Sequence, residues 1–186
     1  MENNIKELKQ RLQVLLEKEA LRRGSFLLSS GKTSNYYLDG RVITLTPEGA
    51  YLVASIMLEM AKGKDIDAIG GPTLGADPIV GAVAALAYQN ALPIKTFIVR
   101  KAAKEHGMAI QVEGPELKAG SKVILVDDVA TTGKSLIEAK EALDKMGVVV
   151  EKAIVIVDRG EGAKENLVKA GLKLESIFEI EDLGVF

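Results

Sequence analysis

Short apolar runs alternate with helical segments along the chain from residue 47 onward. The runs are too short for buried helices and contain many β-branched residues, which favours strands. Strands and helices that alternate in this way form βαβ units, in which helices cover both faces of a parallel sheet. The sequence therefore predicts an α/β fold with a central parallel sheet flanked by helices. The expected strands are residues 68–69, 94–99, 123–126, 148–157 and 174–178, and the expected helices are residues 47–61, 76–89, 134–146 and 162–170.

The two ends of the chain do not follow this alternation. Apolar residues at helical spacing between Ile5 and Leu16 predict a first helix, which we expect Gly24 to end. Alternating residues on both sides of a Ser-Gly-Lys-Thr turn predict a hairpin over residues 25–39. We expect one domain, residues 1–186, with a core of about residues 41–159 under a small hood lobe of about residues 1–40 and 160–186.

Composition excludes several classes of protein. The 24 basic and 26 acidic residues give a net charge of −2, without the basic excess of nucleic-acid-binding proteins. Cysteine is absent, and a single histidine, His106, cannot form a zinc site. The amino terminus has no signal-peptide pattern, and the most apolar run, residues 79–88, is too short to span a bilayer. We therefore expect a cytoplasmic protein that binds neither nucleic acid nor a membrane.

The stretch from Val123 to Ser135, VILVDDVATTGKS, carries the strongest chemical signal. A buried strand ends in two adjacent acids, and a turn rich in hydroxyl groups opens the next helix. Ligands of open α/β sheets bind at the carboxyl ends of strands, and free amides at a helix N-terminus bind phosphate. Two acids beside a phosphate fit a ribose diol and a magnesium ion lying between them. The alternative is that the acids only cap the start of the helix.

This stretch resembles the signature with which type I phosphoribosyltransferases bind phosphoribosyl pyrophosphate (PRPP), and it lacks the Walker A and Gly-x-Gly-x-x-Gly spacings. The resemblance implies that Asp127 and Asp128 hold the ribose hydroxyl groups, in different roles because side chains alternate along a strand. Magnesium is the implied cofactor, and we expect it to be bound through PRPP near the two acids, without a direct protein ligand. The resemblance implies that Thr131, Thr132, Gly133 and Ser135, with neighbouring amides, bind the 5-phosphate. The further PRPP-binding residues implied in this stretch are Val129, Ala130 and Lys134.

Residues 100–107, Arg-Lys-Ala-Ala-Lys-Glu-His-Gly, follow an expected strand and contain no core residues. Arg100 and Lys104 would repel each other on a helix, whereas a cluster of cations suits a polyanion such as pyrophosphate. The segment resembles the catalytic lid of orotate phosphoribosyltransferases, which implies that Arg100, Lys101, Lys104 and His106 grip pyrophosphate. In that family the lid reaches into the neighbouring subunit, so a homodimer is implied. On the charges alone, a solvated loop is the alternative.

The hairpin, residues 26–39, resembles the same family, in which paired aromatic residues cover the pyrimidine. The resemblance implies that Tyr36 and Tyr37 contact orotate, since a flat heteroaromatic ring stacks well on an aromatic face. The alternative is that they are ordinary strand residues, one in the core and one at the surface.

Arg159 stands at the end of another expected strand. A guanidinium there can hold a carboxylate with two hydrogen bonds, and the resemblance implies that Arg159 binds the orotate carboxylate, with Thr131 also in contact with orotate. The alternative is a surface ion pair of Arg159 with Asp158 or Glu161, which would contribute little to stability.

The chain departs from the family at two positions. Ser29 and Leu74 stand where many members carry a lysine close to PRPP or pyrophosphate. Backbone amides of residues 73–76 and the side chain of Lys32 are the candidates to replace those contacts.

The resemblance implies that the protein converts orotate and PRPP to orotidine 5'-monophosphate and pyrophosphate in pyrimidine (UMP) biosynthesis. Two alternatives stay open: a phosphoribosyltransferase for uracil, xanthine or a purine, and a PRPP-sensing transcriptional regulator with the same fold. Arg159 argues against the first, because uracil and adenine have no carboxylate. The net charge of −2 argues against the second.

Overall fold

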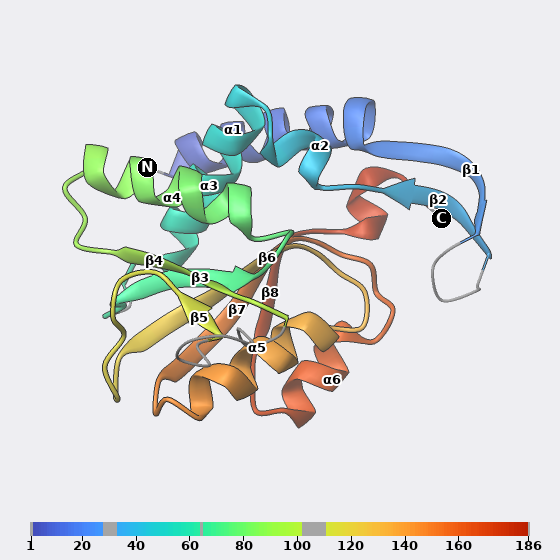
Figure 1. The fold of residues 1–186 in the computed structure, drawn as a ribbon. Coiled ribbons are helices and arrows are strands. Elements are labelled where there is room, and N and C mark those ends of the chain that lie inside the picture. The colour runs from blue at the N-terminus through green and yellow to red at the C-terminus, as the bar shows by residue number, and fades with distance from the viewer. Residues whose placement is uncertain (1, 28–32, 64, 102–110, 186) are drawn as a thin grey trace.

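The computed structural model describes residues 2–27, 33–63, 65–101 and 111–185. These residues form a six-stranded sheet with the order β5-β4-β3-β6-β7-β8, in which β5 runs antiparallel to its neighbour and the other strands are parallel (Figure 1). The predicted α/β fold with parallel central strands is confirmed. The strands are β3 Ala68–Pro72, β4 Lys95–Val99, β5 Val112–Glu113, β6 Lys122–Ala130, β7 Val149–Asp158 and β8 Leu174–Glu179.

Helices cover both faces of the sheet (Figure 1). The α3 helix begins where the hydroxyl of Thr46 accepts the amide of Gly49 at 3.1 Å, and Pro47 occupies the first turn, where its missing N–H costs no helical hydrogen bond. None of the helices in the described ranges is long and apolar enough to cross a membrane. One face carries α1 Glu2–Leu15, α3 Pro47–Ala61 and α4 Asp77–Gln89, and the other carries α5 Lys134–Asp144 and α6 Ala163–Lys169.

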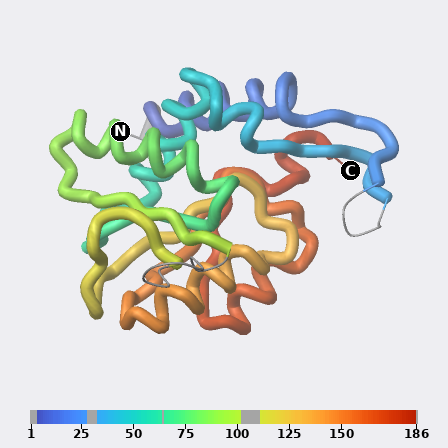
Figure 2. Tube along the Cα trace, viewed as in Figure 1, coloured from blue at the N-terminus to red at the C-terminus, as the bar shows by residue number. Residues whose placement is uncertain are grey.

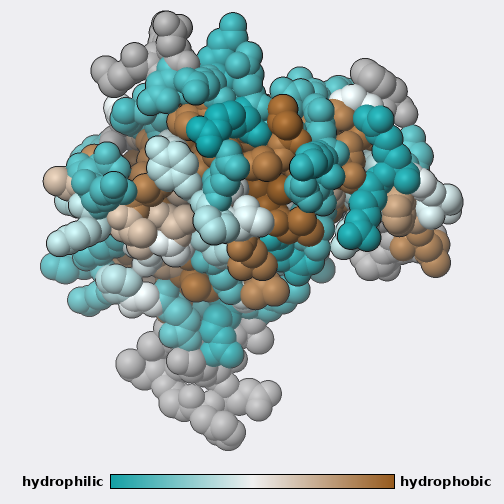
Figure 3. Space-filling model, turned by 90° about the horizontal axis from the view of Figure 1, so that it is seen from above, coloured by the Kyte–Doolittle hydropathy of each residue, from teal (hydrophilic) through white to brown (hydrophobic). Residues whose placement is uncertain are grey.

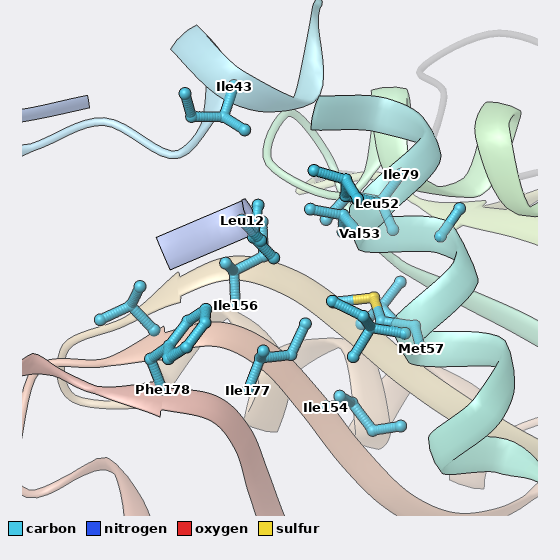
Figure 4. Packing of buried hydrophobic residues seen from close by; sticks show 14 of the residues in the cluster. Leu12, Ile43, Leu52, Val53, Met57, Ile79, Ile154, Ile156, Ile177 and Phe178 are labelled. Carbon is cyan, nitrogen blue, oxygen red and sulfur yellow. The ribbon is translucent and has the colours of Figure 1, made fainter. Parts of the chain in front are cut away.

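Side chains of the central strands alternate between two cores. Ile124 of β6 packs into the core beneath α3, whereas its neighbour Leu125 packs into the core beneath α5. Figure 4 shows the first of these cores, in which Leu12 of α1 lies beside Ile156 of β7 and Met57 of α3 belongs to the same cluster. Both faces of the strands are therefore buried, which accounts for their continuous apolar sequence.

The hood consists of the amino-terminal segments and the end of the chain. Its two strands pair antiparallel, and the carboxy terminus lies beside them (Figure 2). The guanidinium of Arg23 donates to the carbonyl of Gly184 at 3.0 Å, and the amide of Gln13 donates to the carbonyl of Asp182 at 2.8 Å. These bonds hold the carboxy-terminal segment against the hood. The elements are η1 Leu16–Ala20, β1 Leu21–Leu27, β2 Thr33–Leu38, α2 Arg41–Thr44 and η2 Ile180–Leu183.

The structure differs from the sequence prediction in three places. Gly24 does not end the first helix, because pairing with β2 draws the chain into a strand from Leu21, and Gly24 lies within β1 beside an irregularity in that pairing. The strand β5 is too short to produce a periodic pattern. Residues 163–179, which we expected in the hood, form α6 and the outer strand β8 of the central sheet.

Candidate functional site

Four neighbouring parallel strands bring their carboxyl ends to one edge of the sheet. These strands are β4, β3, β6 and β7, and the segments that follow them therefore lie close together (Figure 1). Ligands of α/β sheets bind at this edge. The segments are residues 100–101, 73–76, 131–133 and 159–162, so Arg100 and Lys101, the turn of the motif and Arg159 gather in one region.

The strand β6 continues through both acids of the motif. Asp127 is buried and accepts hydrogen bonds from the hydroxyl of Ser135 at 3.1 Å and from the amide of Asp128 at 3.0 Å. The carboxylate of Asp128 is partly exposed and accepts the amide of Val129 at 2.8 Å. Asp127 thus bonds to the start of α5, whereas Asp128 lies against Gly40 at the base of the hood. These different surroundings are the geometric basis for expecting different roles.

Burial makes both carboxyl groups harder to ionise. It raises the pKa of Asp127 to about 8, and the negative charge of Asp128 adds to this effect. Burial also raises the pKa of Asp128, while the amide of Val129 and the charge of Arg41 oppose the rise. Arg41 is itself held by Asp39, through contacts of 2.9 and 3.0 Å. A ligand that donates hydroxyl groups or brings a cation stabilises the ionised carboxylates, so this pair is prepared for such a ligand.

The turn after β6 leaves consecutive amides without partners. Within the described ranges, the N–H groups of residues 131–135 have no hydrogen-bond acceptor in the protein. Gly133, with a φ of +75°, turns the chain into α5 in a conformation that other residues rarely adopt. The amides therefore converge at the N-terminus of a helix, whose dipole adds partial positive charge. This arrangement can bind a phosphate group.

The loop after β3 packs directly against the two acids. A methyl group on Gly75 would lie 2.2 Å from Oδ1 of Asp127 and 2.5 Å from Oδ1 of Asp128. The hydroxyl of Thr73 donates to the carboxylate of Asp77 at 2.9 Å, which ties the loop to the start of α4. No side chain larger than a hydrogen atom fits at position 75 while the acids stay in place.

The same loop contains Leu74, which stands where many members of the resembling family carry a lysine. Leu74 is 59% exposed and supplies no cation. The amide of Thr73 donates to Val99 at 3.0 Å, and that of Ala76 donates to Pro72 at 3.2 Å. Of the four loop amides proposed as replacements, those of Leu74 and Gly75 alone have no partner in the described structure. Lys32 and Ser29 lie outside the described residues.

Replacing Gly75 with alanine is expected to raise the KM for PRPP and to lower kcat/KM by roughly tenfold or more, because the new methyl group must displace the acids or the loop. Gly81 on α4 is the control: an alanine there meets nothing within 4 Å. Gly81→Ala should keep full activity and stabilise the helix by up to about 1 kcal/mol. Steady-state kinetics and thermal unfolding of both variants test this, and an unchanged KM for PRPP in Gly75→Ala would contradict it.

Arg100 stands at the base of the predicted lid. Its amide donates to the carbonyl of Gln111 at 2.8 Å, and its guanidinium lies 3.6 Å from the carboxylate of Glu113 in β5. These contacts hold the start and end of the lid together. Lys104 and His106 lie outside the described residues, so their contacts with pyrophosphate stay predictions.

A small pocket of about 30 Å³ lies between the base of the predicted lid and the start of α5, beside the turn predicted to bind phosphate. Arg100 and Lys101 line it from the end of β4, Thr73 from the loop after β3, and Ser135 from the start of α5. Two of the predicted lid cations therefore lie beside the segments that surround Asp127.

Arg159 forms the ion pair with Glu161 that was considered above as the alternative, but its side chain is only 9% exposed, so the pair does not lie at the surface. Its Nε lies 3.0 Å from the hydroxyl of Tyr36, to which it donates, and 3.0 Å from a carboxylate oxygen of Glu161. Its Nη2 is buried and has no partner in the described structure. Asp158 instead accepts the amide of Gly160 at 3.0 Å. A positively charged donor is thus left for an anion.

The two tyrosines of β2 face opposite ways. Tyr36 is buried, and its ring centre lies 4.7 Å from the guanidinium carbon of Arg159. Tyr37 is 40% exposed and packs against Phe26, with 5.8 Å between the ring centres. This is the alternation of ordinary strand residues, but the buried tyrosine contacts the arginine that we predicted to bind orotate.

Sequence patterns alone do not identify Gly75 or the hydroxyl of Tyr36 as parts of this site, whereas Glu161 was already considered as an ion-pair partner of Arg159. Gly75 follows a strand end, where a glycine can signal a close approach, yet the approaching groups come from a different strand. The contact between Tyr36 and Arg159 joins residues that are 123 positions apart.

Known proteins similar to this chain agree with the geometry. Residues 45–185 match the family described as Phosphoribosyl transferase domain. The chain is 44% identical to an orotate phosphoribosyltransferase of Nostoc sp., over 97% of this chain and 87% of the relative. It is 43% identical to an orotate phosphoribosyltransferase of Aquifex aeolicus, over 94% of this chain and 97% of the relative.

Solved structures give the same result. The crystal structure of Mycobacterium tuberculosis orotate phosphoribosyltransferase in complex with Fe(III) dicitrate superposes with a TM-score of 0.83 and 36% identity, over 96% of this chain and 99% of that one. The same enzyme in complex with PRPP superposes with a TM-score of 0.79 and 32% identity, with the same coverage. The chain belongs to the phosphoribosyl transferase domain family and, within it, to the orotate phosphoribosyltransferases.

Proposed function

We propose that this protein transfers the 5-phosphoribosyl group of PRPP to orotate, releasing pyrophosphate and forming orotidine 5'-monophosphate for pyrimidine biosynthesis. The observation that carries the proposal is the row of unpartnered amides beside the buried Asp127 and the partly exposed Asp128, within one site that also contains an arginine with a buried, unpartnered Nη2. This set of groups matches the phosphate, the ribose diol and the carboxylated base in turn. We also propose that this reaction takes place in the cytoplasm.

PRPP binds along β6 and the turn that follows it. Asp127 and Asp128 accept the ribose hydroxyl groups, which stabilise the ionised carboxylates against their burial. The amides of residues 131–135 and the hydroxyl groups of Thr131, Thr132 and Ser135 donate to the 5-phosphate. Charge-assisted hydrogen bonds of this kind are stronger than neutral ones.

The donor set at this site fits a magnesium ion that is held mainly by the substrate. Magnesium prefers oxygen ligands and keeps several waters and substrate phosphates in its shell. In the described ranges, no group of three or more carboxylate, histidine or cysteine side chains could hold a metal ion, whereas the oxygens of Asp127 and Asp128 lie together. Bound there, magnesium would neutralise charge on the pyrophosphate as it leaves.

The chain's own residues contribute by positioning and electrostatics. The bond between the ribose carbon and pyrophosphate breaks, and positive charge develops on that carbon. The orotate nitrogen forms the new bond with inversion and gives up its proton to the departing pyrophosphate or to solvent. Arg100 and Lys101, joined by Lys104 and His106 of the lid, neutralise the leaving pyrophosphate and exclude water. Such preorganised charges are worth several kcal/mol in a water-excluded site, and no side chain acts as a nucleophile.

A base-competition assay tests the proposal. The purified protein, with PRPP and magnesium, is offered orotate, uracil, xanthine, hypoxanthine and adenine in parallel. Turnover of orotate alone, lost when magnesium is chelated, is the expected result. Turnover of a different base would overturn the proposed role of Arg159. If PRPP bound but no base were turned over, the proposal would be replaced by a PRPP-sensing regulator, and a salt-dependent gel shift with nucleic acid would follow.

The active form is proposed to be a homodimer in which the lid serves the neighbouring subunit. Exposed apolar side chains support an interface on the face formed by α1, α2 and the start of α3: Val14 is 61%, Val42 is 42% and Leu45 is 74% exposed. Figure 3 shows apolar side chains gathered on this face.

Sedimentation velocity is expected to give twice the mass of the chain. The variant Leu45→Asp should shift the measured mass toward that of a monomer and lose activity. A fully active monomer would contradict the shared lid.

A further inference from the structure

The guanidinium of Arg159 is held along one edge only. A guanidinium offers a carboxylate two forked edges, one formed by Nε with a terminal nitrogen and one formed by the two terminal nitrogens. In Arg159, Nε donates to the hydroxyl of Tyr36 and also faces a carboxylate oxygen of Glu161, each at 3.0 Å. Both protein partners therefore use Nε, and the buried Nη2 has no partner in the described structure.

We propose that Tyr36 and Glu161 are positioning residues, which lock Arg159 by Nε so that its outer edge, Nη1 and Nη2, receives the carboxylate of the base. This inference rests on the proposed role of Arg159 in binding orotate. It assigns Tyr36 a role different from the one implied by family resemblance, since its hydroxyl and ring serve the arginine rather than the pyrimidine.

Three observations support a positioning role over simple packing. A buried charged donor without a partner is costly, so a protein that keeps one in place provides for a ligand there. The guanidinium carbon lies 4.7 Å from the ring centre of Tyr36, so the tyrosine fixes the plane of the guanidinium as well as its Nε. Tyr36 belongs to the hood and Arg159 to the core, so the orientation of Arg159 depends on the hood being closed against the sheet.

Tyr36→Phe is the decisive variant, because it removes the hydroxyl and keeps the ring. The KM for orotate is expected to rise about tenfold, which corresponds to about 1.4 kcal/mol for one hydrogen bond to a charged group, while the KM for PRPP stays within about twofold. Tyr88→Phe is the matched control, since Tyr88 is 89% exposed at the end of α4, and it should match the parent protein in both constants. Thermal unfolding of both variants verifies that they are folded.

Glu161→Gln tests the second partner and distinguishes positioning from competition. If Glu161 positions Arg159, the amide should raise the KM for orotate several-fold. If Glu161 were instead an internal carboxylate that competes with orotate, the same change would lower that KM, and this would overturn its part of the proposal. An unchanged KM for orotate in Tyr36→Phe would overturn the other part.

Arg159→Ala separates failure of this inference from failure of the proposed function. Suppose that Arg159→Ala raises the KM for orotate strongly, whereas Tyr36→Phe and Glu161→Gln leave it unchanged. That result would support the proposed contact between Arg159 and orotate and contradict only the positioning roles. No change in Arg159→Ala would remove the orotate contact itself, and the positioning roles with it.

Discussion

Asparagine at Asp127 or Asp128 is expected to lower kcat/KM for PRPP by roughly a hundredfold or more, while leaving the fold intact. The amide keeps the size of the carboxyl group but replaces an anionic acceptor with a neutral group that presents donors to the ribose hydroxyls. Asp128, which is less buried and lies at the base of the hood, should show its effect mainly in the KM for PRPP. Asp127→Asn also disturbs the bond to Ser135 and should lower kcat as well. Steady-state kinetics with both substrates measures the two effects.

The same substitution at Asp127 is expected to change how stability depends on pH. Between about pH 4 and pH 8 the folded protein holds a proton on Asp127 that the unfolded chain has released, because burial raises the pKa of this group from 3.8 to about 8. Because the folded state binds more protons in this window, raising the pH lowers the free energy of unfolding. Above about pH 8 the whole loss of stability from ionising the buried Asp127 is present. At about pH 9, Asp127→Asn should therefore unfold at a higher urea concentration than the parent protein. The difference between their unfolding midpoints should shrink toward about pH 4.

Asp65→Asn provides the control for both measurements, because Asp65 is fully exposed and precedes β3, at the opposite end of the strands from the site. It should match the parent protein in kinetics and in urea unfolding. If Asp127→Asn kept the activity of the parent protein, the paired acids would not be the ribose site. If its stability had the same pH profile as the parent protein, Asp127 would not be the group whose titration costs stability.

Arg159→Ala is expected to raise the KM for orotate by roughly a hundredfold or more while the KM for PRPP changes little. Two hydrogen bonds from a guanidinium to a carboxylate are each worth about 1.5–3 kcal/mol, and the alanine removes both. The variant also loses the contacts with Tyr36 and Glu161, so some loss of stability should accompany it. Kinetics with each substrate varied in turn, together with thermal unfolding, separates the two effects.

Arg159→Lys sharpens this test because it keeps the charge and removes the fork. A lysine cannot hold Tyr36, Glu161 and a carboxylate in the geometry that the guanidinium provides. It should therefore recover only a small part of the lost affinity for orotate. Full recovery by lysine would mean that charge alone, rather than the held edge of the guanidinium, determines the binding of the base.

Local segments of this fold follow directly from local sequence. The strand, acids, turn and helix of residues 122–144 are contiguous, and their arrangement depends on apolar burial, on Gly133 and on the free amides of a helix start. The helix α3, with Thr46 and Pro47 at its start, matches its predicted bounds for the same reason. In such segments the interacting groups are close in the chain, so a pattern of residue types is enough to predict them.

The sequence by itself thus determined the α/β class, the turn after β6 with its two acids, for which we predicted phosphate binding, and Arg159 as a charged residue at a strand end. Tertiary structure alone decided that Gly75 packs against both acids, that β8 joins the central sheet, and that the hydroxyl of Tyr36 meets Arg159. The physical reason is that parallel strands bring together segments far apart in the chain, and the neighbours of each strand are chosen by packing of the whole domain. The type of a residue limits the interactions that it can make, whereas the folded sheet determines which residues are in contact.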